Sequence, residues 1–322
     1  MENTDGLVVA SNMLNDGLSI NSLRANATTL RHEEWIEFDP KLVKAYQNRL
    51  RGIADLYKAG LVYKMSNGLA RTILTYEMQS DISTAEMSMD GVSRSKGDRP
   101  LISNASIPLP MIFKNFEFNA RVLAESRRFG EGLDARTGEL AARKVAEYAE
   151  QLLFNGSGGF AFSGHTLYGY LTAPNRTTRN LEEDWALEAT TGADILEDVR
   201  GMKQDMINDK RFGPYKVYIP TAYETKMEMD YTTSYPVSIR ERILKIDGIT
   251  SVEVSDQMTA GNVIMVQLDS ETIRLVEGMP LTTWETKSEF EMIHRFKVGT
   301  ILVPQIYSDY NDKCGIVHLR AD

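Results

Sequence analysis

Histidine and cysteine, the usual carriers of metal and nucleophilic chemistry, are few and widely spaced in this 322-residue chain. No histidine has a second histidine, a cysteine or a carboxylate at a metal-ligand spacing such as H-E-x-x-H. Ser163 lies two residues before a histidine, but the G-x-S-x-G turn that exposes a serine nucleophile is absent from the sequence. We therefore expect no catalytic residue, no metal and no cofactor. The four histidines considered are His32, His165, His294 and His318.

The glycine-rich segment Asn155-Gly-Ser-Gly-Gly159 resembles a phosphate-binding loop in composition only. A Walker loop needs G-x-x-x-x-G-K-[ST] between a strand and a helix, because its backbone amides must face the anion. Here the glycines follow a predicted helix, and no Lys-Ser or Lys-Thr pair closes the segment. We interpret it as the C-terminal cap of that helix followed by a loop.

Charge and composition argue against several classes of partner. The net charge is −9, and runs of basic residues do not exceed a pair such as Arg127-Arg128, so no surface for reading DNA is expected. The longest apolar runs, such as residues 263–266, are far shorter than the ~20 residues that span a bilayer. The single cysteine, Cys314, excludes an intrachain disulfide framework and a thiolate zinc cluster, and favours a reducing compartment.

Periodicity predicts helices over residues 40–60, 134–155 and 194–208. The second has Asp134 as a candidate cap and Gly156 as a stop. Residues 223–229 and 238–245 are also expected to be helical. Short strands are predicted at 215–219, 251–254, 263–268, 272–277, 282–287 and 289–298, and Pro304 makes residues 299–307 an edge or bulged strand. Strands and helices do not alternate regularly, so the fold class is α+β. The predicted apolar stripe of the second helix is Leu140, Ala141, Val145, Tyr148, Ala149 and Leu152.

Residues 73–118 read as one long hairpin with a charged tip near residues 90–100. Each leg holds about 15 residues and could reach ~50 Å at ~3.4 Å per residue. The legs contain few of the large aliphatic side chains that a core needs, so we expect the hairpin to lie on solvent or on a neighbouring subunit. Residues 1–32 are polar and aperiodic, which predicts a loose arm.

Five segments of the chain, taken together, are informative. They are Ile107-Pro-Leu-Pro-Met-Ile-Phe-Lys-Asn-Phe-Glu-Phe-Asn-Ala-Arg121; Gly132-Leu-Asp134 with Ala141-Ala-Arg-Lys-Val-Ala-Glu147 and Leu153-Phe-Asn-Gly156; Tyr168-Gly-Tyr-Leu171; Tyr235-Pro-Val-Ser-Ile-Arg-Glu-Arg242; and Ile301-Leu-Val-Pro304. In their order and spacing these segments resemble encapsulins, shell proteins of bacterial nanocompartments. The similarity covers residues 73–317 and does not include the first 70 residues.

This resemblance implies the Hong Kong 97-type fold that encapsulins share with major capsid proteins of tailed phages. The expected elements of that fold fall into recognisable parts of the chain. They are an N-terminal arm (1–70), an extended loop (71–118), a peripheral domain (119–190) with a spine helix (134–155), an axial domain (191–280) and a return to the peripheral domain (281–322).

The resemblance implies a structural protein rather than an enzyme. The expected function is a major capsid protein that assembles into an icosahedral shell around double-stranded DNA. The expected partners are the chain itself in hexamers and pentamers, a portal, scaffolding or decoration proteins, and non-specifically contacted DNA, but no membrane. The location would be the virion capsid, assembled in the host bacterial cytoplasm.

Two other hypotheses remain at this point. A bacterial encapsulin enclosing a cargo enzyme is the alternative, although the polar residues before Trp35 favour a viral arm over a cargo-docking helix. Neighbouring genes would separate these two, since a terminase and a portal accompany a capsid gene. An unrelated soluble enzyme is the third hypothesis, which a size measurement of the purified protein would test.

Charge suggests where the hairpin tip could bind. The tip carries the cations Arg94, Lys96 and Arg99. We expect these residues to contact acidic side chains on the outer face of a neighbour's long helix, where exposed ion pairs contribute only ~0–1 kcal/mol each. The candidate acidic partners are Glu139, Glu147 and Glu150.

Overall fold

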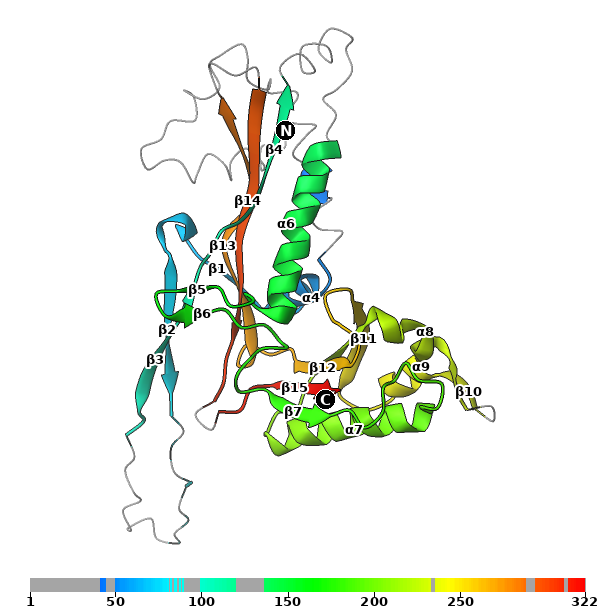
Figure 1. The fold of residues 1–322 in the computed structure, drawn as a ribbon. Helices are drawn as coiled ribbons and strands as arrows, with labels where there is room; N and C mark the ends of the chain where they lie inside the picture. Colours follow the sequence, from blue (N-terminus) through cyan, green and yellow to red (C-terminus); the bar gives the residue numbers. More distant parts are fainter. Residues whose placement is uncertain are drawn as a thin grey trace, which may run out of the picture.

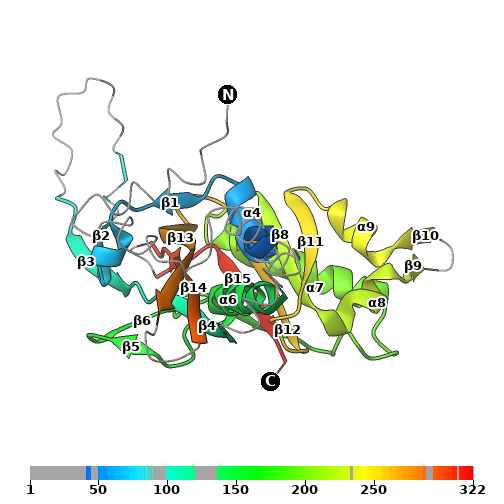
Figure 2. The same cartoon turned by 90° about the horizontal axis from the view of Figure 1, so that it is seen from above.

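The computed structural model describes residues 41–44, 50–80, 82, 84, 85, 87, 89, 99–119, 136–232, 235–287, 293–309 and 312–321. A tall sheet with a long helix beside it stands on a wider lobe, and a two-stranded hairpin leaves the body on one side (Figure 1). Seen from above, the hairpin and the far end of the lobe lie on opposite sides of the long helix (Figure 2).

The tall sheet has the strand order β1-β13-β14-β4, formed by β1 (Val62–Lys64), β13 (Ile273–Lys287), β14 (Ile293–Ile306) and β4 (Ile112–Asn119). β1 is parallel to β13, and the other pairs are antiparallel. The long helix α6 (Arg136–Asn155) packs against β14 and β4. It can approach the sheet closely because its buried face is rich in alanine: Ala141, Ala142, Ala146 and Ala149.

The lobe is built on a mixed sheet of strand order β11-β8-β12-β15-β7. Its strands are β11 (Ile249–Ser255), β8 (Tyr215–Pro220), β12 (Asn262–Gln267), β15 (Ile316–Arg320) and β7 (Thr177–Asn180). Alternate side chains of β8 enter different cores: Tyr218 joins the core around α6, whereas Val217 and Ile219 join the core beneath α7 (Gly192–Asn208). A sheet buried on both faces explains the continuous apolar runs in its central strands.

The structure confirms the helix predicted over residues 194–208, which is α7. Helical spacing places Ile195, Val199, Met202 and Met206 on one face, and all four are fully buried. Thr191 caps the helix and forms a capping box with Asp194, which fixes its first turn. The remaining elements of the lobe are η2 (Thr221–Tyr223), α8 (Glu224–Glu228), β9 (Asp230–Thr232), β10 (Tyr235–Ser238) and α9 (Ile239–Leu244).

The predicted hairpin is real but shorter than expected. β2 (Ile73–Gln79) pairs with β3 (Ile102–Pro108), with Ile73 opposite Pro108 and Gln79 opposite Ile102. The expected second leg to residue 118 is wrong, because β4 leaves the hairpin after Pro110 and pairs with β14 in the tall sheet. The two prolines flanking Leu109 interrupt the strand and let the chain change sheets. Residues 90–98, the predicted tip, lie outside the described residues.

Two other boundaries differ from the prediction. The helix expected over 40–60 is interrupted: residues 41–44 are helical, residues 50–51 are not, and α4 (Gly52–Lys58) begins after them. The two strands expected between 272 and 287 are one, β13, whose pairing with β14 shifts register around Met279. Pro304 lies in β14 beyond the last residue paired with β4, so it occupies a local edge as its type requires.

The C-terminal end of α6 is closed by the segment that follows it. Gly156 has φ +71°, the left-handed conformation typical of a residue just beyond a helix. The amides of Tyr170 and Leu171 donate to the carbonyls of Leu153 and Phe154 at 2.9 and 2.8 Å. The predicted cap and loop are therefore confirmed, and the short hairpin of β5 (Ala161–Phe162) and β6 (His165–Thr166) extends from this loop.

This closure depends on a glycine at position 169. A Cβ added there would lie 2.4 Å from the backbone nitrogen of Gly156, and no side-chain rotation can relieve that overlap. We expect Gly169→Ala to lower the free energy of unfolding by about 3 kcal/mol, the upper end of overpacking costs. The measurement is urea unfolding of the free subunit. Gly158→Ala is the control: its new methyl group meets open space at φ +60°, so only the backbone cost of about 1–2 kcal/mol applies. Equal losses in both variants would contradict the close-approach argument.

Candidate functional site

The predicted contact residues lie in different environments. Arg99 is exposed beside the start of β3, whereas Arg94 and Lys96 lie outside the described residues. On α6, Glu139 and Glu147 are half-buried, and Lys144 Nζ lies 2.6 Å from Glu147 Oε2. These two glutamates therefore remain on a reachable surface of the helix.

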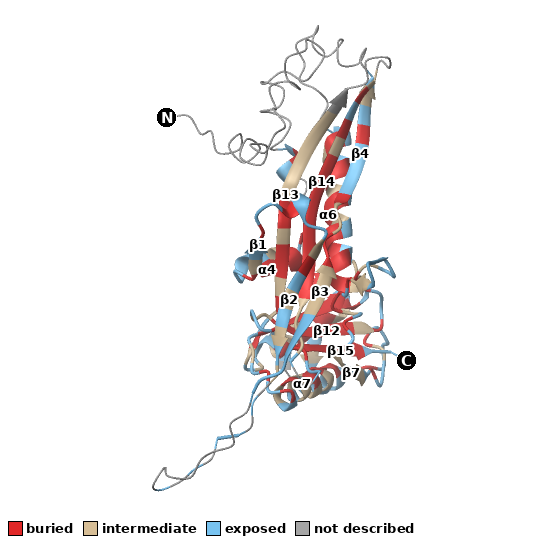
Figure 3. Ribbon diagram, turned by 90° about the vertical axis from the view of Figure 1, so that its left-hand side faces the viewer, coloured by how far each residue is buried: buried red, intermediate tan, exposed pale blue. Residues whose placement is uncertain are grey.

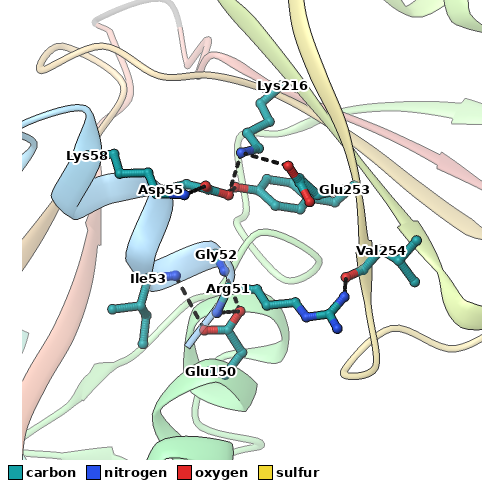
Figure 4. A network of polar contacts seen from close by, with 10 residues as sticks. Arg51, Gly52, Ile53, Asp55, Lys58, Glu150, Lys216, Glu253 and Val254 are labelled. Carbon is teal, nitrogen blue, oxygen red and sulfur yellow. Dashed lines mark hydrogen bonds and ion pairs between the residues drawn. The ribbon is translucent and has the colours of Figure 1, made fainter. Parts of the chain in front are cut away.

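Glu150 is wrongly placed by the sequence prediction. It is only 2% exposed and faces the first turn of α4, not the outer surface. Its Oε1 accepts a hydrogen bond from the amide of Gly52 at 2.5 Å, and Oε2 accepts one from the amide of Ile53 at 3.3 Å (Figure 4). The carboxylate thus satisfies helix amides that have no partner within α4.

Burial sets the protonation of this carboxyl group. Desolvation raises the pKa of Glu150 to about 7, with a further increase from the charge of Asp256, while the amides around Gly52 oppose the shift. The Arg51 guanidinium does not neutralise it, because Nη1 donates to the carbonyl oxygen of Val254 at 3.1 Å. Glu150 is therefore a buried acid that is half-ionised near neutral pH.

A second buried carboxylate, Asp55 of α4, faces β8. Lys216 Nζ lies 2.6 Å from Asp55 Oδ2 and 3.6 Å from Glu253 Oε1, and the hydroxyl of Tyr218 donates to Asp55 Oδ2 at 3.0 Å. Lys216 and Tyr218 are two residues apart on one strand, so they share a face. The Asp55–Lys216 ion pair holds α4 against the sheet of the lobe, and Glu150 holds α4 against α6 (Figure 4).

The outer face of α6 differs from the predicted stripe. Leu140 and Tyr148 were expected in the core, but they are 54% and 49% exposed. They are eight residues apart, with Lys144 halfway between them, so they lie in one row along the helix. The row forms a solvent-facing strip with two apolar groups and one cation, flanked by Glu139 and Glu147.

The hairpin also exposes apolar side chains. Burial decreases along β2 and β3 with distance from the body (Figure 3). Exposed apolar groups on the described part of the hairpin and its extension are Ile82, Met87, Met89, Leu101 and Ile102. Such a concentration of exposed aliphatic and methionine side chains is typical of a surface that another molecule covers.

Two of the described histidines, His294 and His318, have side-chain partners within the fold. His318 is nearly buried; Arg176 Nε donates to its Nδ1 at 3.2 Å, so its Nε2 donates to Asn262 Oδ1 at 2.8 Å. Burial, with the nearby charges of Arg176 and Arg320, lowers its pKa to about 4. His294 Nδ1 lies 3.4 Å from Glu285 Oε1 in the tall sheet. Within the described residues, no group of three histidines, cysteines or acidic residues could hold a metal ion.

Residues 25–319 match the family of unknown function DUF6260. The chain belongs to this family. No curated protein matches the DUF6260 chain. Among its described helices, none is long and apolar enough to cross a membrane.

Solved capsid structures share the fold of this DUF6260 chain. The virus-like particle from Pyrococcus furiosus is 17% identical with a TM-score of 0.62, over 90% of this chain and 99% of that one. The capsid of Myoviridae phage XM1 is 13% identical with a TM-score of 0.61, over 83% and 91%. The capsid of a native GTA particle is 13% identical with a TM-score of 0.59, over 84% and 91%. The expected Hong Kong 97-type fold, of class α+β, is confirmed.

The contact between Glu150 and the start of α4 could have been predicted from the sequence in part. Position 150 follows Ala146 by four residues and adjoins Ala149, so it falls on the alanine-rich face of the helix. A charged residue on such a face indicates a buried polar contact rather than a surface one. Its partners, the amides at the start of α4, had no signal because that helix start was not predicted.

Glu150→Gln tests the protonation of this junction. The pKa of Glu150 is about 7 in the folded state and 4.5 ordinarily, so the protonated carboxyl group stabilises the fold below pH 4.5. This stabilisation is lost as pH rises towards 7. The loss should be on the order of 3 kcal/mol in the free energy of unfolding. Glutamine keeps an accepting oxygen and does not titrate, so its urea-unfolding profile should lack this decrease.

Because the pKa of His318 is lowered to about 4, this residue makes the free energy of unfolding rise between about pH 4 and 6.5. The rise is the same in wild type and in Glu150→Gln, so it cancels when their profiles are subtracted. Glu147→Gln on the accessible face of α6 is the matched control and should keep the wild-type profile. Parallel profiles for wild type and Glu150→Gln would contradict the assignment.

Proposed function

We propose that this chain is the major capsid protein of a tailed phage or a related particle, and that it assembles into an icosahedral shell enclosing double-stranded DNA. The observation that carries the proposal is the likeness to capsid chains over nine-tenths of their length. The role is structural, in agreement with the absence of catalytic signatures in the sequence. In this proposal the chain resides in the virion capsid after assembly in the host bacterial cytoplasm.

The proposal includes a division of the chain into the parts of a capsid subunit. In it, α6 is the spine, the lobe containing α7 is the axial domain, and the projecting loop, expected over 71–118, is limited to residues 71–108 because β4 belongs to the tall sheet. Hexamers and pentamers of the chain are the proposed units of the shell. A portal, scaffolding or decoration proteins, and DNA contacted without sequence preference are the further proposed partners, since the net charge of −9 lets a duplex pack without strong adhesion.

An encapsulin shell enclosing an enzyme is the weaker candidate. Its support is the likeness to the virus-like particle from Pyrococcus furiosus, set against several phage and GTA capsids. Electron microscopy of the purified chain tests the shared part of both proposals: closed shells are expected, and only monomers or small oligomers would exclude both. Co-purification from the native source distinguishes them, because a phage shell should contain DNA and an encapsulin an enzyme.

We further propose that the hairpin of one copy lies on the outer face of α6 of the next copy. Two exposed surfaces of the same chain complement each other here. The apolar groups of the hairpin match Leu140 and Tyr148 on the helix, and the cations of the predicted tip match Glu139 and Glu147. Glu150 takes no part, because it is buried beneath α4.

Charge reversal tests this contact. The triple variant Arg94→Glu, Lys96→Glu and Arg99→Glu should assemble poorly and fold normally, with the largest defect at low ionic strength, where repulsion is least screened. A second variant that adds Glu139→Lys and Glu147→Lys to the reversed hairpin should restore assembly. A control that instead adds Glu182→Lys and Glu183→Lys, two exposed positions between β7 and α7, has the same net charge and should not restore it. Light scattering follows assembly, and circular dichroism checks the fold. Unimpaired assembly of the triple variant at low salt would exclude the charged part of the contact.

Hydrogen exchange tests the apolar part. A free hairpin is marginally stable in water, so amides of residues 73–108 should exchange faster in free subunits than in shells. Equal protection in both states would place the hairpin against its own subunit.

A further inference from the structure

The base of the β2–β3 hairpin is held against the body by four residues from four parts of the chain. Tyr63 lies in β1, Tyr76 in β2, Arg274 in β13, and Tyr307 directly after β14. We call these four residues the base cluster. It lies where the hairpin leaves the body: Leu74, two residues earlier, is in the core, whereas Ile102 at the distal end of β3 is exposed.

Arg274 is the centre of the cluster. Its guanidinium carbon lies 4.6 Å from the ring centroid of Tyr63 and 5.4 Å from that of Tyr307. Its Nε donates to Oε1 of Gln305 at 2.7 Å, and Gln305 is fully buried in the tall sheet. Two aromatic rings and a buried amide thus fix the orientation of this cation.

Tyr76 connects the hairpin to that fixed group. Its ring packs edge-on against Tyr307, with centroids 5.3 Å apart and planes at 80°, a favourable aromatic geometry. Burial raises the pKa of both phenols, and the positive charge of Arg274 opposes the rise. Both rings therefore remain neutral at physiological pH, and the packing does not change with protonation.

The described part of the hairpin is regularly paired. Its strands are paired without a bulge from Ile73–Pro108 to Gln79–Ile102, and the side chains of Thr75 and Ser106 are within hydrogen-bond distance at 3.0 Å. Because this pairing runs without interruption to the body, the contact between Tyr76 and Tyr307 sets the direction in which the paired strands leave it.

We propose that Tyr76, Tyr307 and Arg274 are positioning residues for assembly, which set the angle at which the hairpin reaches a second copy of the chain. This inference rests on the proposed function. In a closed assembly of identical chains, the rotation between neighbours determines whether and at what size the shell closes. A change of hairpin angle repeated at every contact should therefore alter the curvature of the shell without removing the contact itself.

Tyr76→Val is the main test, because valine keeps the strand preference of β2 and removes the ring. Electron microscopy should show shells with a wider range of diameters than wild type, or open sheets. Tyr76→Phe keeps the ring pair and should give wild-type shells. Phe212→Ala, which removes an exposed ring in the lobe, is the control for loss of an aromatic group elsewhere. Wild-type diameters for Tyr76→Val would overturn the proposal.

Arg274→Met provides a second route if Tyr76→Val does not fold. Methionine fills the space between the rings and lacks the charge, so a wider range of diameters is again expected. Wild-type shells from this variant would then overturn the proposal.

Hydrogen exchange of free subunits separates this inference from the proposed function. Amides of 73–79 and 102–108 should exchange about tenfold faster in Tyr76→Val than in Tyr76→Phe, the factor expected for the loss of one aromatic pair. If the wild type forms no shells and this difference is present, the proposed function fails and the base cluster still orients the hairpin. If shells form and the difference is absent, only the positioning role fails.

Discussion

The last two turns of α6 pack against the sheet of the lobe and against α4. Phe154 packs edge-on against Tyr218 of β8 and against Tyr170 of the closing segment, with centroids 5.1 and 5.5 Å apart. Glu150, one turn earlier, accepts hydrogen bonds from two amides at the start of α4. The tall sheet, the lobe and α4 therefore meet at one helix end, and displacement of that end would disturb all three.

This meeting point is polar as well as aromatic, which has a thermodynamic consequence. A buried ion pair such as Lys216–Asp55 offsets its desolvation only through close geometry and additional hydrogen bonds. The 2.6 Å contact and the Tyr218 hydroxyl supply both. Breaking one partner would leave an uncompensated buried charge, whereas the intact pair permits one arrangement of α4 relative to β8. We infer that the pair contributes more to the uniqueness of this arrangement than to its stability.

Local patterns in the sequence predicted the regular elements well. The apolar spacing of 195, 199, 202 and 206 identified α7, and the continuous apolar run at residues 263–266 identified β12, because burial on both faces leaves no polar alternation. The order of the encapsulin-like segments identified the fold. The interruption at residues 50–51 was missed because the apolar spacing continues across it. The contact that fixes the start of α4 comes from Glu150, nearly 100 positions away in the sequence.

The site could be predicted only in part, for a related reason. Residue type alone assigned Leu140 and Tyr148 to the core and Glu150 to the surface, and the structure exchanges these roles. Which face of a helix is buried depends on what packs against it, here the close approach that the alanines allow. The misassigned residues are the informative ones: an exposed leucine and tyrosine suit a surface that a second copy covers, and a buried glutamate suits a joint within the subunit.

A single copy leaves two described surfaces with exposed apolar side chains, the hairpin and the outer row of α6, uncovered. Burying both in one contact between copies would remove the unfavourable exposure of each, and no additional partner is needed because every subunit carries both surfaces. Such a contact is head-to-tail, since different patches of the two copies meet. Head-to-tail contacts close into rings only at particular rotations. In the proposed contact, the buried polar contacts at the end of α6 would keep the receiving surface in place, and the base of the hairpin would aim the arm that reaches it.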